Sequence, residues 1–155
     1  MKKIVLALSV VTLVFSGSSC LKDTSCSEKS ISSETPAMTA YATAHGMTTT
    51  THSSGMLYQI TNPGTGTPPT LNSTVKVRYT GKLMDDHVFD SQTGTPVQFQ
   101  VGGTVPGFQL ALQLLGKGGT IRVIIPSALA YGCTGNGAIP RDAILYFDIE
   151  LVDIL

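Results

Sequence analysis

The chain has 155 residues, 42% of them hydrophobic, and its ten basic residues balance its ten acidic ones. This length suffices for one ordinary domain with some sequence outside it, and it argues against two large cores. The balanced charge shows neither the basic surface that nucleic-acid binding needs nor a strongly acidic tail, so we expect no nucleic-acid partner.

The first twenty residues have the pattern of a secretory signal peptide. Lys2 and Lys3 precede an uncharged run over residues 4–15, small residues follow at 16–19, and Cys20 comes next. The run is shorter than the roughly 18 to 20 residues that cross a bilayer, so we expect export rather than a membrane-spanning anchor. Residues 1–19 are therefore predicted to be a signal peptide.

A signal peptide that ends in small residues and then Cys resembles that of bacterial lipoprotein precursors. The resemblance makes Cys20 the candidate lipidation site, with the mature protein in the periplasm or cell envelope and held on a membrane by its N-terminal lipid. Gly17 stands where such precursors usually carry an aliphatic residue, so cleavage without lipidation stays open as the alternative.

Cys26 and Cys133 are the cysteines that remain besides Cys20. They could pair in an oxidising compartment, and two unpaired thiols without a catalytic role are the alternative. No His or further Cys lies near either of them at a spacing typical of zinc ligands, so no metal site is predicted.

Residues 20–54 are predicted to be a tether, because they are rich in Ser, Thr and Ala and carry few large apolar side chains. Met38, Tyr41 and Ala42 fall at helical spacing, which allows a short helical turn around residues 36–45. We assign this turn no hydrophobic core.

Residues 55–155 are predicted to form one domain of short strands with a single helix. Apolar and alternating patterns predict strands over residues 56–60, 75–79, 97–101, 120–125 and 145–151. The helix has an apolar stripe at i, i+3, i+4 and i+7, made of Phe108, Ala111, Leu112 and Leu115. We therefore expect an α+β fold, with an antiparallel sheet of five to six strands wrapped around one short helix.

The predicted domain contains no nucleophile elbow, phosphate-binding loop, paired-carboxylate motif or dinucleotide fingerprint. His45, His52 and His87 lie in the tether or a polar loop, where a solvated His is the usual finding. The aromatic and aliphatic side chains near strand ends instead indicate an apolar binding pocket.

Several spaced motifs resemble the FKBP-type peptidyl-prolyl cis-trans isomerases, in the order in which that family carries them. They are 77–81 (VRYTG), 88–91 (VFDS), 104–108 (TVPGF), 125–126 (IP), 130–132 (AYG), 139–140 (IP) and 145–151 (LYFDIEL). The resemblance covers about residues 54–155. It implies an FKBP-like fold and the non-covalent acceleration of X-Pro isomerisation in exported proteins. It also implies proline-containing polypeptides as clients, macrolide-type inhibitors as ligands, and no cofactor.

The resemblance also assigns site residues. Tyr79, Asp90 and Tyr131 would be the catalytic side chains, with the Tyr131 hydroxyl and the backbone N–H of Ile139 as donors to substrate carbonyls. The residues expected to bind substrate are Phe89, Val97, Phe99, Val105, Phe108, Ile139 and Phe147.

This sequence departs from the family pattern at three places around the expected pocket. Phe108 stands where Trp is frequent, Val97 replaces a frequent aromatic, and the loop at 133–138 is about one residue shorter than usual. The alternative function is therefore a module that binds proline-containing segments, or a chaperone, with weak turnover.

Overall fold

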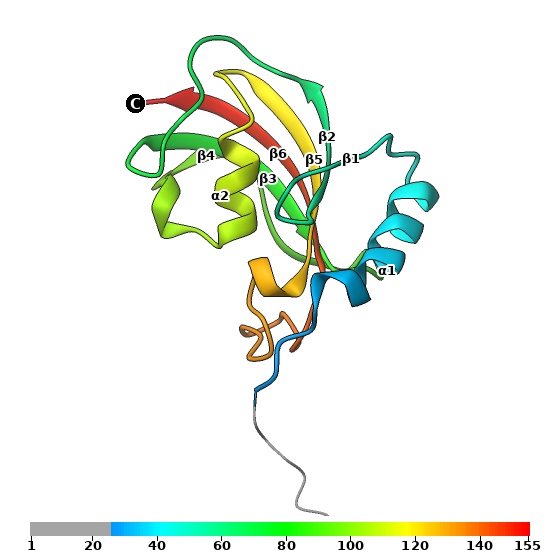
Figure 1. Cartoon of the computed structure of the whole chain (residues 1–155). Helices are drawn as coiled ribbons and strands as arrows, with labels where there is room; N and C mark the ends of the chain where they lie inside the picture. Colours follow the sequence, from blue (N-terminus) through cyan, green and yellow to red (C-terminus); the bar gives the residue numbers. More distant parts are fainter. Residues whose placement is uncertain (1–25) are drawn as a thin grey trace, which may run out of the picture.

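The computed structural model describes residues 26–155, so the predicted signal peptide and Cys20 lie outside the described residues. Figure 1 shows a six-stranded antiparallel sheet in the order β1-β2-β5-β6-β3-β4. The strands are β1 (Thr50–Thr51), β2 (Leu57–Asn62), β3 (Thr74–Lys82), β4 (Val88–Gln100), β5 (Gly119–Ile125) and β6 (Leu145–Ile154). The helical elements are α1 (Ile31–Ala44), η1 (Val101–Gly103), α2 (Pro106–Leu112) and η2 (Ser127–Leu129).

The interior strand β6 shows how the sheet is built. Its residues alternate, so that Leu145, Phe147, Ile149 and Leu151 are buried in the main core cluster on the face that α2 covers. Strands β5 and β3 pair with β6 on either side, with Val123 and Gly81 both opposite Phe147. The predicted antiparallel sheet around a short helix is thereby confirmed.

The predicted apolar stripe of α2 is also present. Phe108, Ala111, Leu112 and Leu115 are all buried in the same cluster as the inner face of β6. Pro106 occupies the first turn, where its missing N–H leaves no hydrogen bond unmade. The helix ends at Leu112, one turn before the stripe does, and Leu115 reaches the core from the segment that follows.

The prediction that residues 20–54 are a tether without a core is wrong for α1. Figure 1 shows α1 across the sheet from α2. Met38, Tyr41 and Ala42 form a second buried cluster with side chains that include Ile124 and Tyr146, which lie on the sheet face turned away from α2. The helical spacing of the three α1 residues was therefore a core signal, and the fold contains a second helix that the prediction omitted.

Polar contacts and a disulfide bond hold α1 and the residues before it to the domain. The Tyr41 hydroxyl donates to Asp86 Oδ1 at 2.7 Å, and His45 Nε2 lies 3.0 Å from the same oxygen. At the other end, Cys26 and Cys133, which are 107 residues apart in the sequence, form a disulfide with their Cα atoms 5.4 Å apart. Of the two alternatives for Cys26 and Cys133, a disulfide or two free thiols, the structure shows the disulfide.

Strand β4 is longer than predicted, since it begins at Val88 rather than at residue 97. Most of its first half is polar and exposed, so its side chains carry no apolar alternation. This part of the strand is held by backbone pairing with β3, in which Tyr79 lies opposite Gln92 and Thr80 opposite Ser91.

In the part of the chain that the structure describes, no helix is long and apolar enough to cross a membrane.

Replacement of Met38 tests whether α1 belongs to the folded domain. Met38 is 0% exposed, so Met38→Ala should lower the free energy of unfolding by about 2 to 5 kcal/mol by leaving a cavity between α1 and the sheet. Urea unfolding would measure this. The control Thr39→Ala, at an exposed position of the same helix, should stay within about 0.5 kcal/mol. An equally small effect of Met38→Ala would restore the tether interpretation.

Candidate active site

A cavity of about 630 Å³ lies on the α2 side of the sheet. Its walls come from β3, β4, β6, the segment from η1 into α2, and the long loop between β5 and β6. The lining residues are Tyr79, Phe89, Asp90, Phe99, Gly103, Thr104, Val105, Pro106, Phe108, Tyr131 and Phe147.

Aromatic rings in edge-to-face contact make the base of this cavity. The Phe108 ring centroid lies 5.2 Å from that of Phe147 with 82° between the planes. Tyr79 and Phe99 pack on Phe108 at 5.7 and 6.0 Å, and Phe89 packs on Phe147 at 5.5 Å. Such pairs stabilise one another beyond the area that they bury, so the cavity has a rigid apolar wall before any ligand enters.

Tyr79 and Asp90 form a hydrogen-bonded pair at the edge of the cavity. The Tyr79 hydroxyl, on β3, donates to Asp90 Oδ2, on β4, at 2.6 Å. Burial, followed by this hydrogen bond, raises the pKa of Tyr79 well above its usual value. The phenol therefore keeps its proton to a higher pH than an exposed tyrosine does, and its hydrogen bond holds the Asp90 carboxyl group beside the cavity.

Tyr131 reaches the cavity from the long loop after β5, in which residues 127–129 form η2. Its carbonyl accepts hydrogen bonds from the Thr134 hydroxyl at 2.8 Å and from the Gly135 N–H at 3.2 Å. Further along, Asn136 and Ile139 exchange backbone hydrogen bonds of 2.9 and 2.8 Å that close the loop tip. The loop is thus internally bonded on the C-terminal side of Tyr131.

A second cavity, of about 480 Å³, lies over the sheet face that carries Arg78, Arg122 and Asp148. Its charged groups already bind one another, since Arg78 Nη1 lies 3.1 Å from Glu150 Oε2 and Arg122 Nε lies 3.8 Å from Asp148 Oδ1. It lacks the aromatic base of the first cavity. The first cavity is therefore the candidate active site.

The composition of the aromatic cavity limits the chemistry that its residues can perform. No lining residue is Ser, Cys, His or Lys, so the cavity lacks the Ser–His and Cys–His pairs that are common in nucleophilic catalysis. Within residues 26–155 no three His, Cys, Asp or Glu side chains gather as they would around a metal ion. The arrangement suits reversible binding of a compact apolar group, with phenols and a carboxyl group beside it.

A family model described as FKBP-type peptidyl-prolyl cis-trans isomerase matches residues 65–152. The chain belongs to the FKBP family. The match includes every residue that lines the aromatic cavity.

Three relatives show how far the similarity extends. FkpA from Escherichia coli (strain K12) is 41% identical over 106 residues, which are 67% of this chain and 39% of FkpA. Outer membrane protein MIP from Legionella longbeachae is 43% identical over 104 residues, or 65% of this chain and 45% of MIP. A solved peptidyl-prolyl cis-trans isomerase from Pseudomonas syringae superposes with a TM-score of 0.67 at 31% identity, covering 83% of this chain and 98% of that one. This chain therefore spans less than half of FkpA and of MIP.

The structure brings the site residues assigned from the FKBP resemblance into one cavity, with two exceptions. Those that line it are Tyr79, Phe89, Asp90, Phe99, Val105, Phe108, Tyr131 and Phe147. Cys20, the predicted lipidation site, lies outside the described residues. The roles of the lining residues in substrate binding and catalysis stay predictions.

Val97 and Ile139 are the exceptions, since neither is among the lining residues. Val97 lies opposite Val77 in the β3–β4 ladder and packs against the core. Ile139 is buried in that core, and its N–H donates to the Asn136 carbonyl at 2.8 Å. The N–H expected to bind a substrate carbonyl therefore already has a partner within the loop.

Gly103, Thr104 and Pro106 line the cavity although the sequence analysis did not assign them to it. Both the side chain and the backbone of Thr104 are hydrogen-bonded. Its hydroxyl donates to the Val101 carbonyl at 2.9 Å, and its carbonyl accepts from Gln109 Nε2 at 2.6 Å. The available signal was their position beside Val105 and Phe108, which were assigned to the pocket.

Gly81 allows two rings of the cavity to meet. It lies opposite Phe147 in the β3–β6 ladder, and a Cβ atom there would lie 2.6 Å from Phe89 Cζ and 2.7 Å from Phe147 Cε1. Real Cβ atoms do not approach neighbours so closely. The Phe89 and Phe147 rings can therefore keep their edge-to-face contact only above a residue without a side chain.

Gly81→Ala is expected to lower the free energy of unfolding by about 1 to 3 kcal/mol, because the added methyl group forces both rings to move. Denaturant unfolding gives the free energy, and the near-ultraviolet circular dichroism of the folded protein reports the aromatic packing. Gly94→Ala is the matched control, because a Cβ at Gly94 meets nothing within 4 Å. If Gly81→Ala matches the control in stability and spectrum, the described packing of the two rings is wrong.

Proposed function

We propose that this protein is a peptidyl-prolyl cis-trans isomerase that accelerates rotation about X-Pro bonds in exported polypeptides. The observation that carries the proposal is the apolar cavity based on Phe108 and Phe147, with phenols and a carboxyl group beside it. Its volume of about 630 Å³ lies within the range of roughly 300 to 1,000 Å³ that is typical of ligand pockets. Membership of the FKBP family supports the same activity.

The reaction needs a change of environment rather than a reactive group. Rotation about a peptide bond must break amide resonance, which gives a barrier of about 18 to 20 kcal/mol. Water stabilises the planar, charge-separated amide better than the twisted transition state. An aromatic wall withdraws that stabilisation from the ground state, so the barrier falls although no bond is made or broken.

The side chains around the cavity divide this work. Phe108 and Phe147 would support the proline ring, and Phe89, Phe99 and Val105 would exclude water from the prolyl amide. The Tyr131 hydroxyl would donate to a substrate carbonyl. Tyr79 and Asp90 would contact the polypeptide at the cavity edge, where their hydrogen bond fixes both groups.

A second candidate function is binding of proline-containing segments with weak turnover. The observation in its favour is the N–H of Ile139, which is already donated to Asn136 and leaves one donor fewer for the transition state. Proline-containing clients, and macrolide-type inhibitors of the family, would occupy the same cavity under either function.

An exchange assay by NMR on a short X-Pro peptide separates the two candidates. We expect acceleration by the oxidised protein, and a loss of about two- to tenfold in kcat/KM for Tyr131→Phe, as expected for one hydrogen bond to the transition state. Tyr58→Phe removes a hydroxyl outside the cavity and serves as the control. Binding without acceleration over the uncatalysed rate would leave only the binding module.

We also propose that the protein acts in the cell envelope, anchored by a lipid on Cys20. The signal-peptide pattern of residues 1–19 supports export, and the Cys26–Cys133 disulfide is typical of an oxidising compartment. The relative MIP is named an outer membrane protein.

Mass spectrometry of the mature chain tests the anchor. We expect Cys20 to be the first residue and to carry the added mass of acyl chains, and Cys20→Ser should move the protein from the membrane fraction to the soluble fraction. A soluble wild-type protein with an unmodified Cys20 thiol would show that export occurs without lipidation.

A further inference from the structure

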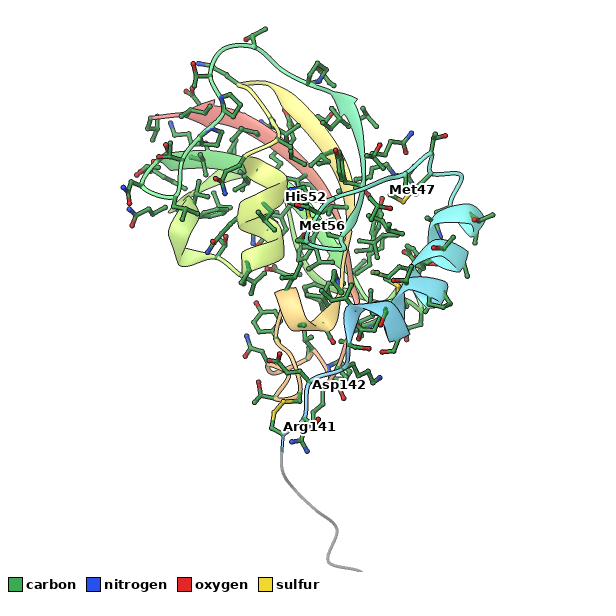
Figure 2. All side chains as sticks on the ribbon, viewed as in Figure 1. Met47, His52, Met56, Arg141 and Asp142 are labelled. Atoms are coloured by element: carbon green, nitrogen blue, oxygen red, sulfur yellow. A yellow bond between two sulfur atoms is a disulfide. The ribbon has the colours of Figure 1, made fainter. Side chains whose placement is uncertain are left out.

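Residues 26–34, which lead into the first turn of α1, are attached at both ends to the loop that carries Tyr131. Cys26 is joined to Cys133 by the disulfide bond. Glu34, one turn into α1, binds Ser127 at the start of η2. Figure 2 shows the disulfide close to the labelled Arg141, whose Nε donates to the Cys133 carbonyl. The two attachments enclose Tyr131 in the sequence between residues 127 and 133.

Glu34 is a buried carboxylate, only 4% exposed, and both of its oxygens are used on one residue. Oε2 accepts the Ser127 N–H at 2.9 Å, and Oε1 accepts the Ser127 hydroxyl at 2.7 Å. Burial of a carboxylate is unfavourable unless donors replace its water, and Ser127 supplies two of them. In return, Glu34 fixes the first residue of η2, whose N–H has no partner within the turn.

The Ser127 carbonyl extends this constraint to Tyr131. It accepts the N–H of Ala130 and the N–H of Gly132, each at 2.9 Å, and these are the two residues that flank Tyr131. Gly132 has φ +53°, and a Cβ there would lie 3.0 Å from Glu28 Oε1, so the segment between Cys26 and α1 also lies against it. The residues on both sides of Tyr131 are therefore bonded to Ser127, and residues 26–34 contact both Ser127 and Gly132.

We propose that Glu34 and the Cys26–Cys133 disulfide are positioning groups for Tyr131. They set where the Tyr131 phenol stands in the cavity without touching the cavity, since Glu34, Cys26 and Cys133 are not among the lining residues. The proposal rests on the proposed isomerase function, in which the Tyr131 hydroxyl meets a substrate carbonyl. A donor on a loop needs such support, because catalytic groups must be held within about 0.5 Å of their productive position.

The first test uses the oxidised chain and compares three variants at α1. Glu34→Ala removes both acceptors, whereas Glu34→Gln keeps the shape and can still accept the Ser127 N–H while donating to its hydroxyl. Tyr41→Phe is the matched control, because it removes a hydrogen bond of α1 at its opposite end, to Asp86. Denaturant unfolding is measured for each variant, so that kcat and KM refer to the folded fraction.

A role in positioning predicts a specific pattern. Glu34→Ala should lower kcat more than it raises KM, by about three- to tenfold, because misplacing the Tyr131 hydroxyl can cost no more than the loss expected from removing it. Glu34→Gln and Tyr41→Phe should stay within about twofold of the wild type. In the Tyr131→Phe background Glu34→Ala should have little further effect, because the hydroxyl that it positions is already gone. Equal kcat in Glu34→Ala and Tyr41→Phe would overturn the proposal and leave Glu34 a stabilising residue only.

The second test addresses the disulfide and does not depend on turnover. In the double variant Cys26→Ser, Cys133→Ser, amide hydrogen exchange should accelerate over residues 128–134 while β5 and β6 keep their protection. Ser127→Ala removes only the hydroxyl that donates to Glu34, and it replaces Glu34→Ala if that variant does not fold. It should also accelerate amide exchange over residues 128–134. Unchanged exchange in the loop of both variants would overturn the proposal. A wild-type protein without isomerase activity would refute the proposed function instead, and the exchange data would still decide whether residues 26–34 order the loop.

Discussion

The contact between Phe108 and Phe147 joins the short helix α2 to the interior strand β6, with their ring centroids 5.2 Å apart. Tyr79, Phe89 and Phe99 pack on one or the other of these two rings, so the cavity base is also the surface of the hydrophobic core. A substitution in this group changes the stability of the domain and the shape of the cavity together. The same dependence extends to Gly81, whose missing side chain gives the Phe89 and Phe147 rings their room.

Strand β6 also couples this core to the opposite face of the sheet. Phe147 points into the aromatic cluster, while its neighbour Tyr146 is buried beneath α1 with Met38 and Tyr41. The α1 side has no part in the cavity wall, but it reaches the cavity indirectly through Glu34 and the loop that follows β5. A segment that lies outside the residues matched to the family thus adjoins the loop that carries Tyr131.

Much of the fold could be predicted from local patterns, because burial on one face of a strand or helix leaves a period in the sequence. The alternation of β6 and the stripe of α2 are examples, and each matches the observed burial. The first half of β4 lacks such a period, since its polar residues form an exposed part of the ladder and are held by backbone bonds to β3. The stripe of α1 was present but short, and the Ser- and Thr-rich sequence around it indicated a tether.

Local patterns in the sequence were enough to predict α2 and most strands of the main core, and the resemblance to the FKBP family indicated the aromatic residues that line the cavity. The contacts between side chains that lie far apart in the sequence became known only from the tertiary structure. Cys26 meets Cys133 and Glu34 meets Ser127, at sequence separations of 107 and 93 residues. The physical reason is that these contacts depend on where the sheet places two separate segments, and a side chain carries no local signal of the partner it will meet.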